Sequence, residues 1–164
     1  MLMSSIVGII SDTHGLMRPE ALAALHGSAA ILHAGDIGSE LVLRTLQEIA
    51  PVYAVRGNND TAEWAATIPV AADVTIAGIS IHVLHDINDF KIDTATQRVR
   101  VVVTGHSHRP LIKERHGILF INPGSAGPRR FTLPVSVAKL EICADKLTAT
   151  LIELDVPRPS QSKQ

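Results

Sequence analysis

The segment VVVTGHSHRP, Val101 to Pro110, decides how the rest of the chain is organised. Its first residues are apolar and β-branched, which is typical of a buried strand, and this run ends at Gly105. His106 and His108 follow directly. On an extended chain, residues two apart point to the same side, so the spacing predicts that both imidazoles converge on one object just beyond the strand. Such an imidazole pair is typical of a metal site.

Length and composition indicate a single domain with an aliphatic core. The chain has 164 residues, of which 46% are hydrophobic and only 3% aromatic, and its formal net charge is −1. The scarcity of aromatic side chains and of Lys/Arg runs argues against a stable nucleic-acid complex. One cysteine, Cys143, excludes an intrachain disulfide and fits a reducing compartment.

The two ends of the chain carry no targeting signal that we recognise. The apolar N-terminal stretch lacks a basic region and leads directly into Asp12, and no segment has the length of a membrane span. We therefore expect a cytoplasmic protein without a membrane partner. Residues 157–164 are rich in Pro, Ser and Gln and are expected to form a disordered tail after a single domain over residues 1–156.

Strands and helices alternate in the first half of the chain. The patterns predict strands over residues 6–11, 29–33 and 52–55, and helices that begin near Pro19, Glu40 and Asp60. Asp60 and Glu63 have the spacing of a capping box. This order is typical of parallel strands with crossover helices.

The second half is richer in strands. We expect a hairpin over residues 74–84, a short helix near 94–98, and strands beginning at Val101, Ile118, Val135 and Leu147. We interpret this half as mostly antiparallel. The sequence therefore predicts an α/β fold of two packed sheets with helices outside.

Polar side chains interrupt this pattern where strands end. In α/β sheets, sites form at the carboxyl ends of the strands, so these side chains are expected at one rim. The candidate ligands are Asp12, His14, Asp36, Asn58, His85, His106 and His108.

Seven ligands exceed the four that one zinc takes, so they favour two metal ions that share a carboxylate. Asp36 comes alone from a central strand and is the natural bridge. A nitrogen and oxygen donor set without thiolate favours Mn, Fe, Zn, Ni or Co over Mg or Ca. Two divalent ions outweigh Asp12 and Asp36 in charge, so the centre calls for an anionic substrate. Hydrolysis of a phosphoryl ester uses both the pair of metal ions, which can activate a bridging hydroxide, and the excess positive charge, which binds the phosphate.

The motifs D-x-H, G-D, G-N-x-D, a strand-end His and G-H-x-H, in this order, resemble those of the calcineurin-like metallophosphoesterase superfamily. The fuller wording, SDTHGLMRPE, HAGDIGS, VRGNND, GHSHRP and NPGSAGPRR, resembles its small bacterial and archaeal phosphodiesterase branch, over residues 6–154. The resemblance implies an α/β/β/α sandwich of two mixed β-sheets flanked by helices, with a dinuclear metal site at strand carboxyl ends. It also implies a small phosphodiester substrate, manganese or a similar ion, and assembly into homodimers or homotetramers.

The resemblance also assigns the metal ligands. One ion would be held by Asp12, His14, Asp36 and His108, and the other by Asp36, Asn58, His85 and His106.

Two positions depart from the family pattern. Many members carry a His after the ligand Asn that protonates the leaving group, oriented by the acid that follows; here these catalytic positions are Asn59 and Asp60. Because Asn59 cannot act as an acid, we expect slow turnover and loose selectivity, and the simplest role of Asp60 is a helix cap. Asp86 follows His85 at a position where relatives commonly have Gly. It is a candidate for narrowing the pocket against anions or for accepting a hydrogen bond from one of the metal-binding side chains.

Substrate contacts are assigned to Arg18, Asn122 and Arg129, since guanidinium groups bind phosphate in a forked geometry and Asn122 begins a turn of the family pattern. His33 is either a donor that orients a ligand or an ordinary strand residue. Two alternatives remain: a phosphomonoesterase or nucleotide phosphatase on the same centre, and a non-catalytic scaffold similar to a subunit of the retromer complex. The filled ligand positions argue against the scaffold.

Overall fold

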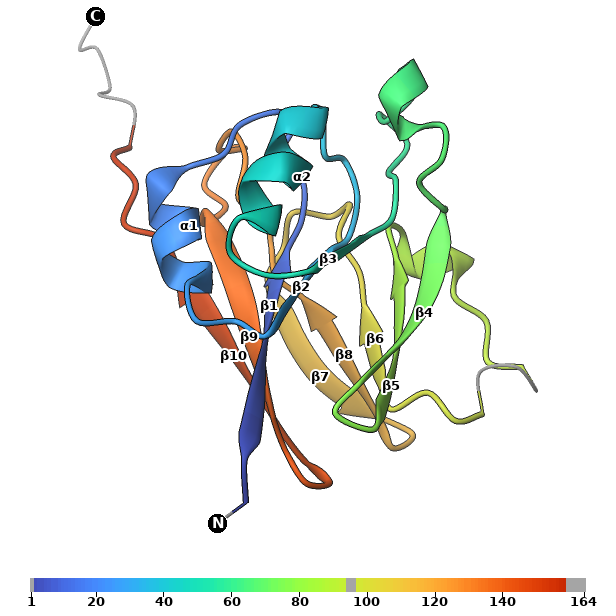
Figure 1. The fold of residues 1–164 in the computed structure, drawn as a ribbon. Helices are drawn as coiled ribbons and strands as arrows, with labels where there is room; N and C mark the ends of the chain where they lie inside the picture. The colour runs from blue at the N-terminus through green and yellow to red at the C-terminus, as the bar shows by residue number, and fades with distance from the viewer. Residues whose placement is uncertain (1, 94–96, 159–164) are drawn as a thin grey trace, which may run out of the picture.

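The computed structural model describes residues 2–93 and 97–158 as two five-stranded sheets packed face to face (Figure 1). Along the chain the elements are β1 (Ser4–Ile10), α1 (Pro19–Leu25), β2 (Ala30–His33), α2 (Glu40–Gln47), β3 (Val52–Ala54), η1 (Glu63–Ala65), β4 (Ala71–Ile76), β5 (Ile79–Leu84), η2 (Ile87–Asp89), β6 (Val101–Val103), β7 (Leu111–Arg115), β8 (Ile118–Asn122), β9 (Ser136–Cys143) and β10 (Lys146–Glu153).

Both sheets are mixed. The first has the order β10-β9-β1-β2-β3, in which β1, β2 and β3 are parallel and β9 and β10 are antiparallel to their neighbours. The second has the order β4-β5-β6-β8-β7, in which β5, β6 and β8 are parallel and only β4 and β7 pair antiparallel. Among the named strands of the second half of the chain, four pairings are antiparallel and two are parallel, so the expectation of a mostly antiparallel second half is confirmed, while both parallel pairings lie in the second sheet. Its three parallel strands send their carboxyl ends to one edge.

The main core lies between the sheets and follows the two-residue period of the strands. On β1, Val7 and Ile9 face the other sheet, while Ile10 packs outward beneath the helices. On β6, Val101 and Val103 face inward and Val102 packs on the outer face. Because side chains alternate across a strand, each strand contributes to both a shared inner layer and its own outer layer.

The outer layers of the two sheets differ. α1 and α2 cover the outer face of the first sheet, where they pack on Ile10, Ile31 and Val137. The Ser39 side chain caps α2 by accepting a hydrogen bond from the Leu41 amide. In the described ranges, the outer face of the second sheet carries the short 3-10 turn η2 rather than an α-helix (Figure 1). The flanking helices of the sandwich thus lie on one side.

Several boundaries differ from the sequence expectations. Strand β7, which follows the GHSHRP segment, was not predicted, because its exposed Leu-Ile-Lys-Glu-Arg sequence alternates only weakly. The expected helix at Asp60 is only the 3-10 turn η1, which begins after Ala62 and receives no side-chain cap. Of the helix expected near 94–98, residues 94–96 lie outside the described residues, and 97–98 form a turn. Of the tail predicted over 157–164, only 157–158 are described.

Within the described residues, no helix is long and apolar enough to cross a membrane.

Removing one inner-layer side chain tests the packing between the sheets. Leu140 on β9 is fully buried in the inter-sheet cluster, so Leu140→Ala should lower the free energy of unfolding by about 2–5 kcal/mol. Leu151→Ala is the control, since Leu151 on β10 is 37% exposed. Urea denaturation of both variants gives the comparison, and equal losses would contradict this description of the core.

Candidate metal centre

The carboxyl ends of strands from both sheets meet at one rim. Backbone hydrogen bonds join the loop after β1 to the loop after β2: the Asp12 amide donates to the Gly35 carbonyl and the His14 amide to the Asp36 carbonyl, each at 2.9 Å. The His106 amide, after β6, donates to Asp12 Oδ2 at 3.1 Å. Main-chain hydrogen bonds therefore hold together segments that are far apart in the sequence, and these bonds do not depend on a metal ion.

Five of the seven predicted ligands have a left-handed backbone, with φ between +47° and +67°: Asp12, His14, Asp36, His106 and His108. Residues with a side chain avoid this region, at a cost of roughly 1–3 kcal/mol each, so it persists only where neighbouring structure enforces it. The glycines beside the ligands are needed for space. A methyl group on Gly57 would overlap the Asp36 carboxylate, and one on Gly105 would overlap Ser11 and Asp12.

One cluster of donor atoms consists of Asp12, His14 and His108, whose ligand atoms all lie within 4.8 Å of one another. Asp12 Oδ1 lies 3.2 Å from His108 Nε2 and 4.0 Å from His14 Nε2. Donor atoms bound to one ion at about 2.1 Å are separated by roughly 3–4 Å, so these spacings suit a shared divalent cation. Asp12 and His108 are almost completely buried.

A second cluster forms around His85. Its Nε2 lies 3.3 Å from Asp36 Oδ2 and 3.9 Å from Asp12 Oδ1, and these three residues also group within 4.8 Å. His106 joins this cluster, with its Nδ1 3.3 Å from His85 Nε2. Asn58 is exposed and lines the same hollow as His85 and His106.

The two histidines of the GHSH segment therefore do not converge on one object, as their spacing suggested. His108 faces Asp12, whereas His106 faces His85. The reason is the left-handed backbone at both residues, which replaces the extended chain that the prediction assumed. They contribute to different clusters.

Asp36 lies between the clusters. Its Oδ2 is 3.8 Å from His14 Nε2 and 3.3 Å from His85 Nε2, which is the position expected of a bridging carboxylate. Asn59 orients it: the Asn59 backbone amide donates to Asp36 Oδ1 and the side-chain amide to Asp36 Oδ2, both at 3.0 Å. Because both contacts are to the Asp36 carboxylate, Asn59 is a positioning residue here.

The donor atoms are prepared for metal ions. His85 Nδ1 donates to the Ala34 carbonyl at 2.7 Å, which leaves Nε2 unprotonated and aimed at the centre when the imidazole is neutral. Asp12 Oδ1 and His14 Nε2 are buried atoms without a hydrogen-bond partner among the described residues. Buried polar atoms are normally satisfied, and a cation would satisfy both.

Electrostatics keep both carboxylates charged. Burial by itself raises the pKa of Asp36, but hydrogen bonds from His85 and Asn59 outweigh it and hold that pKa below its ordinary value. Burial likewise raises the pKa of Asp12, but the neighbouring His108 imidazole and a hydrogen bond from Ser11 more than reverse this effect, so that pKa is lowered. Burial lowers the pKa of His85, but its contacts with Asp36 and the Ala34 carbonyl leave that pKa raised. Metal binding must therefore compete with a proton on His85.

His33, whose role the sequence left open, supports the ligand loops. Thr13 Oγ1 donates to the Ile37 carbonyl at 2.8 Å, so His33 Nε2 must donate to Thr13 Oγ1 at 2.9 Å. The Gly35 amide donates to His33 Nδ1 at 3.1 Å. This fully buried imidazole is therefore neutral, and burial lowers its pKa to about 4.

Asp60 is not a helix cap. It is buried and accepts hydrogen bonds from the backbone amides of Ile37, Gly38 and Gly57 at 2.9–3.0 Å, so it ties the loop after β2 to the loop after β3. Sequence spacing could not reveal this, because two of the three partners lie 22 and 23 residues away.

The three residues predicted to contact substrate each have hydrogen-bond partners within the protein, and Asn122 also lines the hollow that extends along β7 and β8. Arg18 donates to the Gly127 carbonyl, and Arg129 donates to the carbonyls of Leu133 and Val156. Neither arginine lines the hollows beside the clusters. Asn122 is buried and donates to the Gly105 carbonyl at 2.8 Å, so it holds the loop that carries His106.

Two hollows open beside the clusters. One, of about 470 Å³, is lined by Asn58, His85 and His106, and the other, of about 730 Å³, extends from His106 along β7 and β8. His106 and Asp86 line both. Asp86 Oδ1 accepts from the Asn88 amide at 2.9 Å, and its Oδ2 lies 3.7 Å from His106 Nε2, so it contacts a ligand as one sequence interpretation proposed.

Comparison with known proteins agrees with this geometry. Residues 6–145 match the model of the calcineurin-like phosphoesterase superfamily domain, and the chain belongs to this family. It is 34% identical to a probable metallophosphoesterase of Methanothermobacter thermautotrophicus, over 93% of this chain and 94% of that one.

Two further similarities concern phosphodiesterases. The chain is 27% identical to a phosphodiesterase of Methanocaldococcus jannaschii, over 72% of this chain and 82% of that one. The solved structure of an archaeal phosphodiesterase has the same fold, with a TM-score of 0.76 and 24% identity over 91% of this chain and 99% of that one.

The buried neutral His33 predicts acid sensitivity of the metal-free protein. Its folded pKa of about 4 lies below the unfolded value of 6.5, so the unfolded chain binds a proton first as the pH falls. Stability present above pH 6.5 should therefore be lost between pH 6.5 and 4, by about 3 kcal/mol. Urea denaturation in EDTA at pH 7 and pH 4 should give a smaller loss for His33→Gln than for wild type. Equal losses would contradict the assignment.

Asp60→Asn should weaken both the fold and the metal site. The variant places an NH2 group against a backbone amide, which should cost roughly 1–3 kcal/mol, and should lower Mn²⁺ affinity roughly 10–100-fold because Asp36 and Asn58 lose their anchor. Asp145→Asn, in the exposed turn between β9 and β10, is the control. Calorimetric Mn²⁺ titration and urea denaturation measure the two effects. Identical behaviour of the variants would refute this role of Asp60.

Proposed function

We propose that this phosphoesterase-family chain hydrolyses small phosphodiesters at a centre of two divalent metal ions. The observation that carries the proposal is the position of Asp36 between two clusters of donor atoms, 3.8 Å from His14 and 3.3 Å from His85. A single ion would need only one of these clusters.

The contacts support the two ligand sets expected from the sequence. Asp12, His14, Asp36 and His108 would hold one ion, and Asp36, Asn58, His85 and His106 the other. Divalent ions bound there would supply positive charge for the phosphate oxygens and lower the pKa of a water molecule between them. Mn²⁺ is the ion we propose, because imidazole, amide and carboxylate donors without thiolate suit borderline and harder divalent ions.

The preference for a diester rests on the two hollows that meet at His106 and Asp86. A diester carries a substituent on each of two ester oxygens, and one hollow is available for each. The Asp86 carboxylate, 3.7 Å from His106, adds negative charge that opposes a dianionic monoester more than a monoanionic diester.

Protonation of the leaving group is the weak part of this site. Both amide groups of Asn59 are engaged with Asp36, and Asn59 has no acidic proton to give. Asp60 is fully engaged with backbone amides. We therefore propose that neither residue transfers a proton and that stable leaving groups, which need little protonation, react fastest.

Purified protein supplied with Mn²⁺ should hydrolyse bis-p-nitrophenyl phosphate, and EDTA should abolish this activity. Asp36→Asn and His108→Ala should each reduce it at least roughly 100-fold, because the first removes the negative charge of the bridging carboxylate and the second removes a ligand. His26→Ala is the matched control, since His26 is exposed at the end of α1, away from both clusters.

Two outcomes would contradict the proposal. If either ligand variant keeps the wild-type rate with Mn²⁺, the ligand assignment fails. If p-nitrophenyl phosphate is hydrolysed faster than the diester, the phosphomonoesterase alternative replaces the diesterase.

A further inference from the structure

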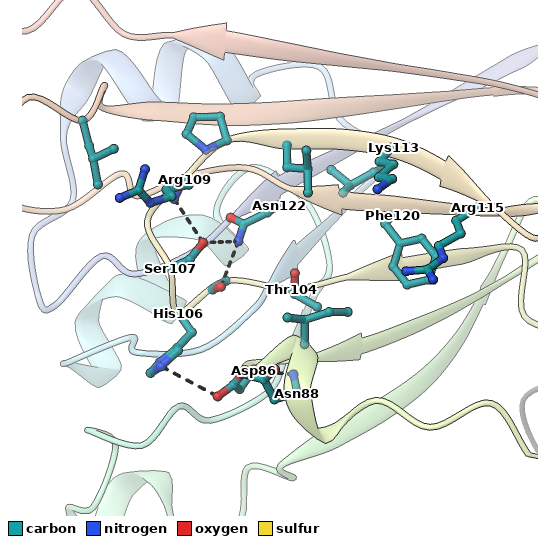
Figure 2. Close-up of a pocket in the computed structure, with 16 residues that line it drawn as sticks. Asp86, Asn88, Thr104, His106, Ser107, Arg109, Lys113, Arg115, Phe120 and Asn122 are labelled. Carbon is teal, nitrogen blue, oxygen red and sulfur yellow. Dashed lines mark hydrogen bonds and ion pairs between the residues drawn. The ribbon is translucent and has the colours of Figure 1, made fainter.

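The larger hollow, of about 730 Å³, is a candidate substrate pocket with its own chemistry (Figure 2). It begins at His106 and Asp86, beside the metal centre, and continues over the outer face of the second sheet along β7 and β8. This face lacks an α-helical cover in the described ranges, which is why the pocket is open there. Its volume suits one small organic group.

The middle of the pocket is apolar. Ile87, Leu111, Phe120 and Leu133 contribute to its wall. Ile87 and Leu111 are 45% and 50% exposed, so they add accessible apolar surface to this wall. Phe120 is held edge-on against Phe90, with ring centroids 5.8 Å apart, so its orientation is fixed. A flat aromatic group would bury this wall and stack on an aromatic side chain.

The pocket is also strongly cationic. Arg109, Lys113 and Arg115 line it, and Asp86 is the one acidic residue among the described lining residues. Side chains alternate along β7, so Glu114 points to the opposite face of the sheet from Lys113 and Arg115. In the described part of the chain, neither Lys113 nor Arg115 has an ion pair. Their charges are available to a ligand.

The order of these groups is set by strand pairing. Asn122 pairs with Leu111, Phe120 with Lys113 and Ile118 with Arg115. Successive positions on one face of a strand are about 7 Å apart, so Lys113 and Arg115 lie roughly 7 and 14 Å beyond the Leu111 level. From the metal centre outward, the ligand therefore meets His106, then Leu111, then Phe120 and Lys113 at one level, with Arg115 beyond them. Figure 2 shows Lys113 and Arg115 at the end of the pocket away from His106.

We propose that this pocket takes the nucleoside 5′-monophosphate end of a short 5′-phosphorylated oligonucleotide such as a dinucleotide. Its base would lie on the Phe120 wall, and its terminal phosphate would bind Lys113 and Arg115. This inference rests on the proposed function, since it places the scissile diester at the metal centre beside His106. Such a substrate combines a flat base with a terminal phosphate, which is a second anionic group besides the scissile diester.

The reaction balances with water as the sole co-reactant. The water oxygen forms a bond to the diester phosphorus, and the bond from phosphorus to the 3′-oxygen of the nucleotide in the pocket breaks. That oxygen gains a proton, so the nucleotide leaves as a nucleoside 5′-monophosphate. The second nucleoside keeps the attacked phosphate as its own 5′-monophosphate.

Binding of the product tests the pocket without any metal. In EDTA, adenosine 5′-monophosphate should bind roughly tenfold more tightly than adenosine, because the phosphate gains charge-assisted hydrogen bonds. The double variant K113Q/R115Q should remove this difference. K139Q/K146Q is the matched control, because it removes the same charge from β9 and β10, away from the pocket. Calorimetry gives the affinities.

Phe120→Leu tests the base contact and keeps an apolar side chain, so the fold should survive; circular dichroism checks this. The variant should weaken adenosine 5′-monophosphate several-fold and leave ribose 5-phosphate unchanged. Equal affinity of wild type for adenosine 5′-monophosphate and adenosine, or an equal loss in the control double variant, would overturn the proposal.

Kinetics separate this inference from the proposed function. With Mn²⁺, wild type should cleave pApA with a kcat/KM roughly tenfold above that for ApA, and K113Q/R115Q should lose this preference while keeping its rate on bis-p-nitrophenyl phosphate. Hydrolysis of the nitrophenyl diester without a preference for pApA would overturn the inference alone. If no diester is cleaved but the nucleotide binding above is observed, the proposed function fails and a nucleotide site remains.

Discussion

The structure depends on two buried carboxylates held among imidazoles at the junction of two sheets. Asp12 is fully buried and Asp36 almost so, and their oxygens lie 3.2–4.0 Å from the nitrogens of His14, His85 and His108. Uncompensated buried charge is strongly unfavourable, so this arrangement is stable only with positive charge between the residues. The contacts of His85 with Asp36 and the Ala34 carbonyl raise its pKa and so favour its charged form, and two divalent ions would supply more positive charge.

Holding these groups requires strain and a rigid support. The left-handed backbone at Asp12, His14 and Asp36 is unfavourable for residues with side chains. Main-chain hydrogen bonds between the loops, together with His33 and Asp60, offset this cost. Several residues that would not contact a metal ion or a substrate are therefore needed to support the site. Their role is to keep the donor atoms in place before a metal ion arrives.

The asymmetry of the sandwich has a functional consequence. α1 and α2 cover one sheet, whereas the other keeps an open outer face beside His106. Among the residues that the structure describes, no α-helix covers this face, which departs from a symmetric four-layer fold and leaves room for an apolar and cationic pocket. A substrate reaching from the metal centre to Lys113 would use this room.

The sequence alone determined most of the strands, the seven candidate ligands that follow them and the family resemblance, because these depend on local order and motif spacing. Only the tertiary structure showed that β5, β6 and β8 are parallel, and that His106 and His108 face different clusters. It also showed that Arg18 and Arg129 bind carbonyl groups. These features depend on contacts between residues far apart in the chain and on left-handed backbone, neither of which a residue pattern encodes.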